Sequence, residues 1–316
     1  MTDTYDTLVI GGGPAGLSAA LHLAWHGRSA LVLDRRTGPL FYTLNTLENV
    51  PGFAGRTGIQ LQQELRRQAE AMGAEVKPAN VVRVSGQAGA FVAETEDGSW
   101  YAGRTLLLAT GVARYHPTVD GDYRPCLAYA GKCNLYYCPD CEAPEIAGKR
   151  TLVIGVGKSR GAVGTAKHLY EHSQDLLLLL TGEDDLREAD RAWIAARHLP
   201  LYQGDIQKLT GHKGCLESVT LNDGTAIAAD AFFVAGPKVP RTDLAQQLGL
   251  TLAASGHVEP KSQRGDTSVE GVWIAGDLRP MTQQVAIALG TGNIAAVHID
   301  QYLAARVPAP PHQPGL

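Results

Sequence analysis

The feature that most constrains this chain is a glycine-rich loop that joins a short apolar run to a helical pattern. Residues 7–10 are apolar and partly β-branched, as in a buried strand. Residues 17–26 follow with helical periodicity, and Gly27 is placed to end that helix. Residues 30–33 then give a second buried strand. This order of strand, loop, helix and strand predicts a βαβ unit of the dinucleotide-binding type.

The loop itself, residues 11–16, has the spacing G-x-G-x-x-G. In this fingerprint Gly11 makes the tight turn, Gly13 lets the backbone approach a pyrophosphate, and Gly16 packs the helix against the strand. The helix N-terminus binds the phosphates, because its first N–H groups have no partner within the helix. Asp34 follows the second strand, about 20 residues on, where a carboxylate accepts hydrogen bonds from a ribose. This part of the chain therefore predicts a nucleotide site.

A C-x-x-C pair, Cys138 and Cys141, lies near the middle of a chain with only five cysteines. Thiols at this spacing can close a small disulfide, and a thiolate at a helix N-terminus has a lowered pKa. Pro139 favours the first turn of a helix, because its fixed φ suits that position. Glu142 follows directly and is placed to exchange a proton with a departing thiolate. The pair alone is also compatible with a structural metal site, so a redox function rests on its setting between two glycine loops.

Length and charge narrow the function classes further. A chain of 316 residues is long enough for about two domains. Its formal net charge of −4 argues against a general nucleic-acid binder, and no apolar run approaches the ~20 residues of a membrane span. The first residues lack the features of a signal peptide, so a cytoplasmic location is expected. An odd number of cysteines does not suggest a disulfide framework.

A second βαβ pattern begins at residues 151–154, but its glycine loop is irregular. Arg160 occupies the third glycine position, and the next glycine comes one residue late. The strand at 176–180 has no carboxylate directly at its end to accept a ribose, and the acidic cluster at 183–185 would repel a 2′-phosphate. We interpret this region as a dinucleotide-type domain whose pyridine-nucleotide site is weakened or lost. An alternative is that Glu183 accepts an NAD ribose through a shifted loop.

The remaining segments complete the organisation. Residues 38–53 form a long loop of turn-forming residues, and residues 75–100 alternate as antiparallel strands do. Residues 105–108 form a buried strand that ends in Ala-Thr-Gly. Residues 269–275 give a strand that ends in Gly-Asp, before a long helical pattern at 282–303.

This order of motifs (glycine fingerprint, Ala-Thr-Gly, C-x-x-C, second glycine loop, Gly-Asp and closing helix) resembles the low-molecular-weight thioredoxin reductase family over nearly the whole chain. The resemblance implies an α/β fold with two dinucleotide-binding, Rossmann-like, three-layer domains. It implies a discontinuous FAD-binding domain, residues 1–115 and 243–316, split by an inserted disulfide-bearing, NAD(P)-type domain, residues 116–242. It also implies FAD as the cofactor and a homodimer.

The resemblance assigns roles to particular residues. Cys138, Cys141 and Glu142 are expected to be catalytic, with Cys141 facing the flavin and Cys138 exchanging with a partner disulfide. No metal ligand is expected. Residues expected to bind FAD, some of them near the flavin ring, are Gly11, Gly13, Pro14, Ala15, Gly16, Asp34, Arg35, Asn49, Ala109, Thr110, Gly111, Gly276, Asp277, Gln283, Gln284 and Val285.

Three departures from the family pattern bear on the electron donor. Glu142 stands where the family usually has aspartate, a shorter side chain that performs the same proton transfer. The His-Arg-Arg motif that binds NADPH is replaced by Thr181-Gly182-Glu183, and Arg160 interrupts the second glycine loop. The chain therefore resembles the pyridine-nucleotide-independent branch of the family, for which a ferredoxin-type or other non-pyridine donor is expected.

The expected function is FAD-dependent exchange of electrons with the Cys138–Cys141 dithiol and then with a protein disulfide such as that of thioredoxin, from a donor other than NADPH. The same parts would serve a dithiol oxidase that passes electrons to oxygen, or a conventional NAD(P)H-dependent thioredoxin reductase. A non-enzymatic alternative is a structural zinc protein, in which Cys126 and Cys133 join the C-x-x-C pair as ligands. These two are more simply interpreted as small buried residues, and Cys215 has no assigned role.

Overall fold

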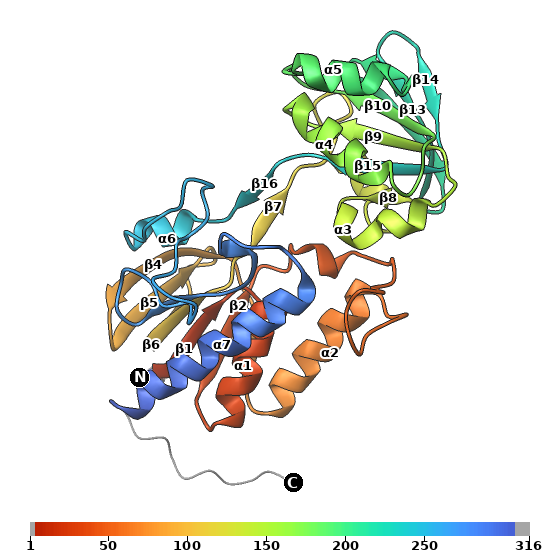
Figure 1. The fold of residues 1–316 in the computed structure, drawn as a ribbon. Helices are drawn as coiled ribbons and strands as arrows, with labels where there is room; N and C mark the ends of the chain where they lie inside the picture. Colours follow the sequence, from red (N-terminus) through yellow and green to blue (C-terminus); the bar gives the residue numbers. More distant parts are fainter. Residues whose placement is uncertain (1–3, 307–316) are drawn as a thin grey trace. The chain divides into compact units, whose positions relative to one another are not determined.

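The computed structural model describes residues 4–306, and the chain divides into two compact units (Figure 1). Unit 1 consists of Met1–Phe41, Ile59–Ala113 and Val239–Leu316, and unit 2 of Tyr42–Gly58 and Arg114–Lys238. Two short strands along the connections pair with each other, β7 (Val112–Arg114) and β16 (Lys238–Pro240). Unit 2 thus includes residues 42–58, which precede the inserted domain in sequence. The domain boundaries expected from the resemblance stay a prediction.

Unit 1 is built on a seven-stranded sheet. Its parallel part has the order β3-β2-β1-β6, and β17 also pairs with β6 in parallel. At its N-terminal end β6 pairs with β5, and β5 with β4, as an antiparallel extension. The expectation that residues 75–100 are all antiparallel is therefore wrong for β3. The strands are β1 (Thr4–Ile10), β2 (Ala30–Asp34), β3 (Glu75–Pro78), β4 (Val81–Gln87), β5 (Ala90–Thr95), β6 (Trp100–Leu108) and β17 (Val272–Ile274).

Alternation of side chains along these strands produces three layers. Leu8 and Leu31, on one face of the parallel strands, share a core with Val84 and Phe91 of the antiparallel extension. Val9 points to the opposite face, toward the first helix. The first and last helices, far apart in sequence, pack side by side (Figure 1). The helices of unit 1 are α1 (Pro14–Trp25), α2 (Gly58–Ala71), α6 (Asp243–Gln247) and α7 (Val285–Ala304), with 3-10 turns at η1 (Pro39–Phe41) and η4 (Gly276–Leu278).

Unit 2 repeats this architecture. Its five-stranded parallel sheet has the order β11-β10-β9-β15-β8, and a separate antiparallel sheet has the order β12-β13-β14. Val153 and Leu178 pack with the helices, whereas their neighbours Leu152 and Leu179 pack with Val219 of the antiparallel sheet. The strands are β8 (Leu135–Tyr136), β9 (Thr151–Gly155), β10 (Leu176–Leu180), β11 (Leu201–Gln203), β12 (Ile206–His212), β13 (Cys215–Leu221), β14 (Ala226–Ala228) and β15 (Ala231–Ala235).

The helices of unit 2 are α3 (Pro139–Glu142), α4 (Ser159–Leu169) and α5 (Glu188–Ala195), with 3-10 turns at η2 (Arg124–Ala128) and η3 (Ala143–Ile146). Each unit thus has helices, a parallel sheet and antiparallel strands in successive layers, which confirms the expected α/β fold with two Rossmann-like domains. Within residues 4–306, no helix has both the length and the apolar character needed to cross a membrane.

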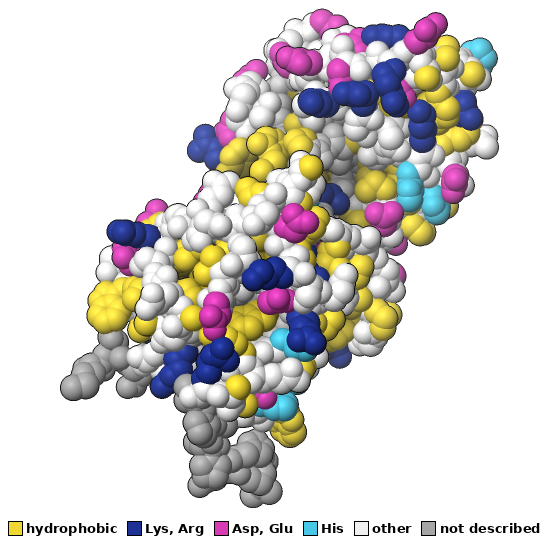
Figure 2. Space-filling model, turned by 60° about the vertical axis from the view of Figure 1, so that its left-hand side comes forward, with side chains coloured by type: hydrophobic (Ala, Val, Ile, Leu, Met, Phe, Trp, Pro, Cys, Tyr) yellow, Lys and Arg dark blue, Asp and Glu magenta, His cyan; other side chains and the backbone are white. Residues whose placement is uncertain are grey.

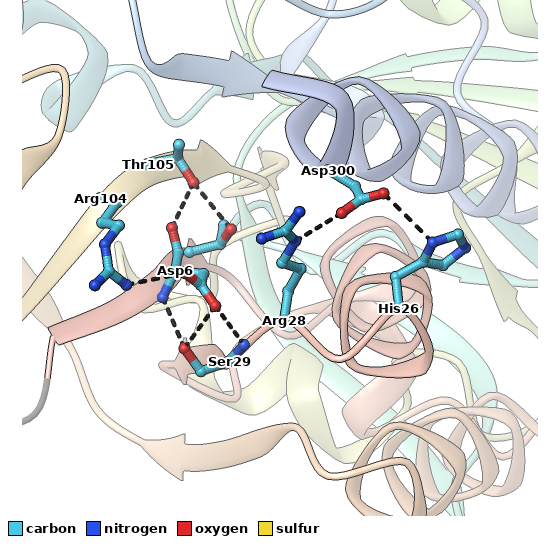
Figure 3. Close-up of polar contacts among 8 residues, drawn as sticks. Asp6, His26, Arg28, Ser29, Arg104, Thr105 and Asp300 are labelled. Carbon is cyan, nitrogen blue, oxygen red and sulfur yellow. Dashed lines mark hydrogen bonds and ion pairs between the residues drawn. The ribbon is translucent and has the colours of Figure 1, made fainter. Parts of the chain in front are cut away.

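A buried polar network closes the N-terminal end of the sheet in unit 1 (Figure 3). One Asp6 carboxylate oxygen accepts hydrogen bonds from the backbone N–H and hydroxyl of Ser29, at 2.9 and 3.1 Å, and the other accepts one from Arg104, at 2.9 Å. Asp6 is only 7% exposed, whereas Ser29 is exposed and Arg104 is half-buried, so water can reach these donors when the carboxylate is absent. A second set of contacts ties the end of α1 to α7, where Arg28 donates to Asp300 at 2.7 Å.

Asp6→Ala should lower the free energy of unfolding by about 1–2 kcal/mol, because the hydrogen bonds from Ser29 and Arg104 to its buried carboxylate are lost. Glu70→Ala is the matched control, since it breaks the exposed Arg66–Glu70 pair and should cost about 0.5 kcal/mol or less. Exposed ion pairs of this kind recur on the protein surface, where basic side chains lie beside acidic ones (Figure 2). Scanning calorimetry compares the variants, and equal losses in both would contradict this role of Asp6.

Candidate functional site

The first glycine loop has the steric properties that its spacing predicts. Gly11 has a φ of +108°, and a Cβ there would lie 2.4 Å from the carbonyl oxygen of Ala109. At Gly16 a Cβ would lie 1.9 Å from the Gly11 carbonyl oxygen, so only glycine lets the helix approach the strand this closely. Gly13, by contrast, has nothing within 4 Å of its Cβ position, which leaves open space beside the backbone where α1 begins at Pro14.

Asp34 lies at the end of β2, directly beside this loop. A Cβ at Gly12 would meet the Asp34 side chain at 2.7 Å, and Asp34 accepts the backbone N–H of Arg36 at 3.1 Å. Arg35 is exposed. Gln62 of α2 donates to the Gly12 carbonyl, while its Oε1 is buried with no hydrogen-bond partner. No sequence signal marks Gln62, because its place depends on how α2 packs.

The Ala-Thr-Gly segment reaches the same edge of the sheet at the end of β6. Ala109 donates its N–H to the Ile10 carbonyl at 2.8 Å, and its own carbonyl lies against Gly11. The Thr110 hydroxyl donates to the Arg241 carbonyl at 2.8 Å, and Arg241 returns a hydrogen bond from its N–H to the Gly111 carbonyl at 3.0 Å. These bonds fix the chain at the carboxyl ends of the parallel strands, where open α/β sheets bind ligands.

The Gly-Asp segment and the start of α7 come to the N-terminal end of α1. A Cβ at Gly276 would lie 2.9 Å from the Cβ of Ala15, and one at Gly292 would lie 2.0 Å from the Ala15 carbonyl oxygen. Asp277 follows in η4 and is half-buried. Helix α7 begins at Val285, and Gln284 is its N-cap residue. These two residues and the preceding Gln283 are also half-buried.

These observations fit a dinucleotide bound along the sheet edge of unit 1. The space at Gly13 suits a pyrophosphate, and Asp34 lies where a ribose would meet it. Gln283 Oε1 and Gln62 Oε1 are both buried without a hydrogen-bond partner, and a bound polar group would satisfy them. Asn49 is exposed on the 42–58 segment, which belongs to unit 2, and its place near the flavin stays a prediction.

Cys138 and Cys141 form a disulfide with their Cα atoms 5.2 Å apart. Cys138 is the N-cap residue of α3 and Pro139 its first residue, as the sequence predicts. The helix is a single turn of four residues, however, so any dipole effect on a thiolate is smaller than expected. Cys138 is only 5% exposed, whereas Cys141 is half-buried.

The Glu142 carboxylate lies beside this disulfide. Its Oε2 accepts backbone N–H groups of Tyr137 and Cys138, both at 2.9 Å. Burial raises the pKa of Glu142 above its ordinary value, an effect that these two N–H groups, Arg114 and Asn45 oppose. Arg114 Nε is itself buried with no hydrogen-bond partner. Glu142 is thus a carboxyl group that holds its proton more strongly than an exposed one, with the Arg114 and Asn45 side chains in its surroundings.

Sequence reasoning missed a polar cluster behind the C-x-x-C segment. The Tyr137 hydroxyl lies 2.7 Å from His116 Nδ1 and also interacts with the Cys126 thiol. Burial raises the pKa of Cys126 to about 12, so this thiol stays protonated. Cys126 is buried as expected, and it supports the strand that leads to Cys138.

In the second glycine loop, one N–H group at the helix start already has an anionic partner. The backbone N–H of Arg160, at the start of α4, donates to Asp185 Oδ1 at 3.0 Å, and its guanidinium to Oδ2 at 2.8 Å. The Arg160 side chain lowers the pKa of Asp185, which is therefore charged. The close helix-to-strand contact is made by Ala162, whose Cβ would lie 2.8 Å from a Cβ on Gly155. Glu183 is exposed, and its carbonyl accepts the Ser159 hydroxyl at 2.6 Å.

A second disulfide joins Cys133 to Cys215. The interpretation of Cys133 as a small buried residue is therefore wrong, and Cys215 has a partner 82 residues away in sequence. Because Cys133 and Cys138 belong to different disulfides, the four cysteines of the zinc alternative do not form one ligand set. Among residues 4–306 no group of three His, Cys, Asp or Glu side chains is arranged to hold a metal ion.

Comparison with known proteins finds relatives that match this chain over nearly its whole length. The bifunctional thioredoxin reductase/thioredoxin of Mycobacterium leprae is 28% identical over 312 residues, which are 95% of this chain and 66% of that longer protein. The thioredoxin reductase of Streptomyces clavuligerus is 29% identical over 318 residues, with 96% of each chain covered. The crystal structure of HlmI matches with a TM-score of 0.84 and 28% identity, covering 96% of this chain and 95% of that one.

A family model for the pyridine nucleotide-disulphide oxidoreductases matches residues 5–292, which include both glycine loops, the C-x-x-C pair and the Gly-Asp segment. Proteins of this family bind FAD, and the open glycine loop and unpaired glutamine oxygens of unit 1 fit that cofactor. The chain is a flavin disulfide oxidoreductase of the thioredoxin reductase type. It belongs to the pyridine nucleotide-disulphide oxidoreductase family.

Proposed function

We propose that this enzyme exchanges electrons between FAD, the Cys138–Cys141 disulfide and a partner disulfide such as that of a thioredoxin, and that its electron donor is not NADPH. The observation that carries the proposal is the closed Cys138–Cys141 disulfide with the half-buried Glu142 carboxyl beside it, held by two N–H groups. FAD would be held by the glycine loop, Asp34 and the start of α7, and it would supply or accept the two electrons.

The protein's own residues carry the exchange with the partner. In the reducing direction, Glu142 gives a proton to a thiolate released from the Cys138–Cys141 bond. Cys138 Sγ then attacks one sulfur of the partner disulfide, and the other partner sulfur leaves as a thiolate and is protonated. Cys141 Sγ attacks the mixed disulfide at Cys138, which re-forms the Cys138–Cys141 bond and releases the second partner thiol. Two electrons and two protons have then passed to the partner.

The burial of Cys138 places a condition on this sequence. A sulfur on a residue 5% exposed is not accessible to the disulfide of a folded protein. Exchange with a protein therefore requires a conformational change that exposes Cys138. The assignment of Cys138 as the exchanging thiol, and of Cys141 as the one that faces the flavin, rests on the family resemblance.

The donor proposal rests on Asp185. A pyrophosphate binds a dinucleotide fold through the N–H groups at a helix N-terminus, and here the Arg160 N–H is bonded to the Asp185 carboxylate. A phosphate at this place would have to displace a charged carboxylate that Arg160 also binds through its side chain. This favours the pyridine-nucleotide-independent branch and a ferredoxin-type or other non-pyridine donor. A homodimer and a cytoplasmic location stay predictions.

Cys138→Ser should abolish turnover of a protein disulfide while the purified variant keeps its bound FAD, because the exchange thiol is lost but unit 1 is untouched. Cys126→Ala is the matched control, since it removes a buried thiol with a raised pKa and should retain turnover. Flavin absorbance and thiol release measure the two properties. Retained turnover in Cys138→Ser would refute the assignment.

Mixing the oxidised enzyme with NADPH in the absence of oxygen should leave the flavin yellow, because the Arg160 N–H at the start of α4 is already bonded to the Asp185 carboxylate. Dithionite is the positive control and should bleach the flavin fully. Stopped-flow absorbance follows both reactions. Rapid bleaching by NADPH would overturn the donor proposal and leave the disulfide chemistry standing.

Glu142→Gln should lower turnover by about 100-fold, because general acid–base catalysis contributes at least that much. The wild-type rate should be full below the raised pKa of Glu142 and fall as the pH rises through it, since the proton donor is then lost. Glutamine still accepts both N–H groups but does not titrate, so the variant should lack this limb of the profile. Glu142→Asp should keep the limb, and an unchanged limb in Glu142→Gln would assign the proton transfer to another group.

A further inference from the structure

The Cys133–Cys215 disulfide joins two parts of unit 2 that are distant in sequence. Its Cα atoms are 5.0 Å apart, and it closes a loop across 82 positions. Cys133 lies just before β8, and Cys215 is the first residue of β13, next to the turn of the β12–β13 hairpin. The bond therefore ties the antiparallel sheet to the edge strand of the parallel sheet.

Asn134 extends this tie by hydrogen bonds. Its Nδ2 donates to the carbonyls of Leu216 and Asp230, both at 2.8 Å, and its Oδ1 accepts the Leu216 N–H at 2.8 Å. Its backbone carbonyl accepts the Phe232 N–H at 2.9 Å. Residues 133 and 134 thus join β8 to both sheets. β8 has only two residues, and this junction adds to its pairing with β15 and the burial of Leu135 and Tyr136.

The chain leaves this junction directly into the redox segment. Cys138 follows the end of β8 by two positions. On the other side of the junction, the Gly131 carbonyl accepts the N–H groups of Leu44 and Asn45, at 2.7 and 3.1 Å. Asn45 is one of the residues that influence Glu142. The Cys133–Cys215 bond therefore lies at the base of both segments that surround the Cys138–Cys141 pair.

This second disulfide is also placed to react. Cys133 and Cys215 are half-buried, beside the exposed hairpin turn of His212 and Lys213. Lys132 precedes Cys133, and its side chain packs against Gly214. Both cysteines are therefore more accessible to an external dithiol than the buried Cys126.

We propose that Cys133–Cys215 is a second redox site, which external dithiols reduce and which controls the order of the Cys138–Cys141 segment. A dithiol thiolate attacks one sulfur of the bond, and the other leaves as a cysteine thiolate and is protonated. The second thiol of the reductant then displaces the remaining cysteine, so the reductant becomes a disulfide and the protein gains two thiols. The reverse exchange with an oxidised dithiol restores the bond.

Reduction removes the covalent tie and leaves β8 held by the Asn134 hydrogen bonds, its pairing with β15 and the burial of Leu135 and Tyr136. The segment from 131 to 137 should then exchange its amide hydrogens faster, and disulfide turnover should fall several-fold because Cys138 and Glu142 are less well positioned. The effect on turnover rests on the function proposed above. The effect on amide exchange does not.

A thiol titration tests whether the bond responds to dithiols in the folded enzyme. In Cys138→Ser/Cys141→Ser, three cysteines of the five remain, and only Cys126 is free while Cys133–Cys215 is intact. The native variant is equilibrated with mixtures of reduced and oxidised dithiothreitol, alkylated, and analysed by mass spectrometry. We expect labelling of Cys133 and Cys215 to rise together while the protein stays folded. Labelling only after denaturation would show a purely structural bond and overturn the proposal.

The double variant Cys133→Ser/Cys215→Ser tests whether loss of this bond loosens the segment that leads to Cys138. Compared with wild type and with Cys126→Ala, it should show faster hydrogen exchange in peptides covering 131–137 and several-fold slower turnover of a small aromatic disulfide. Unchanged exchange and unchanged turnover would overturn the proposed control. If wild type itself has no disulfide turnover, the proposed function fails, and hydrogen exchange in the oxidised and reduced enzyme still decides whether this bond orders the segment.

Discussion

The first N–H groups of a helix need partners from outside it, and the two βαβ units of this chain meet that need in opposite ways. At α1 the space beside Gly13 is open, because no side chain of the protein enters it. At α4 the Asp185 carboxylate takes the Arg160 N–H and is held there by the Arg160 guanidinium. The two helix starts therefore differ: the one at α1 is open, and at α4 one N–H is bonded to the protein's own carboxylate, which is the basis of the donor proposal.

This difference gives unit 2 a separate task. Its parallel sheet and covering strands serve to hold a short segment, in which the two-residue strand β8 leads into Cys138. A strand this short contributes few ladder bonds, so side-chain bonds and a covalent link supply the rest. Asn134 mimics a strand neighbour by bonding both polar groups of Leu216, and the adjacent Cys133–Cys215 bond fixes the same register. The redox pair is thus positioned by bonds that lie before it in the chain.

Much of this arrangement follows from local sequence. The glycine loop could be predicted because a Cβ at Gly16 would meet backbone, a steric fact that holds in any chain with this turn. The single turn after Cys138 could be predicted because Pro139 suits only the first position of a helix. The Cys133–Cys215 bond could not, since its partners are 82 residues apart and only the packing of two sheets brings them together. The ion pair between Arg160 and Asp185 likewise depends on a loop path that no local pattern specifies.

The burial that protects the redox pair also shapes its chemistry. Partial burial of Glu142 raises its pKa, so the carboxyl can keep a proton until a thiolate forms beside it and accepts that proton. The same burial leaves Cys138 out of reach of a folded partner. One fixed conformation therefore cannot both retain the proton and present the sulfur. Under the proposed function, the two requirements are compatible only if proton transfer takes place in the buried state and exchange with the partner in a state where Cys138 is exposed. A segment that must pass between these states needs a firm base, which the bonds before β8 provide.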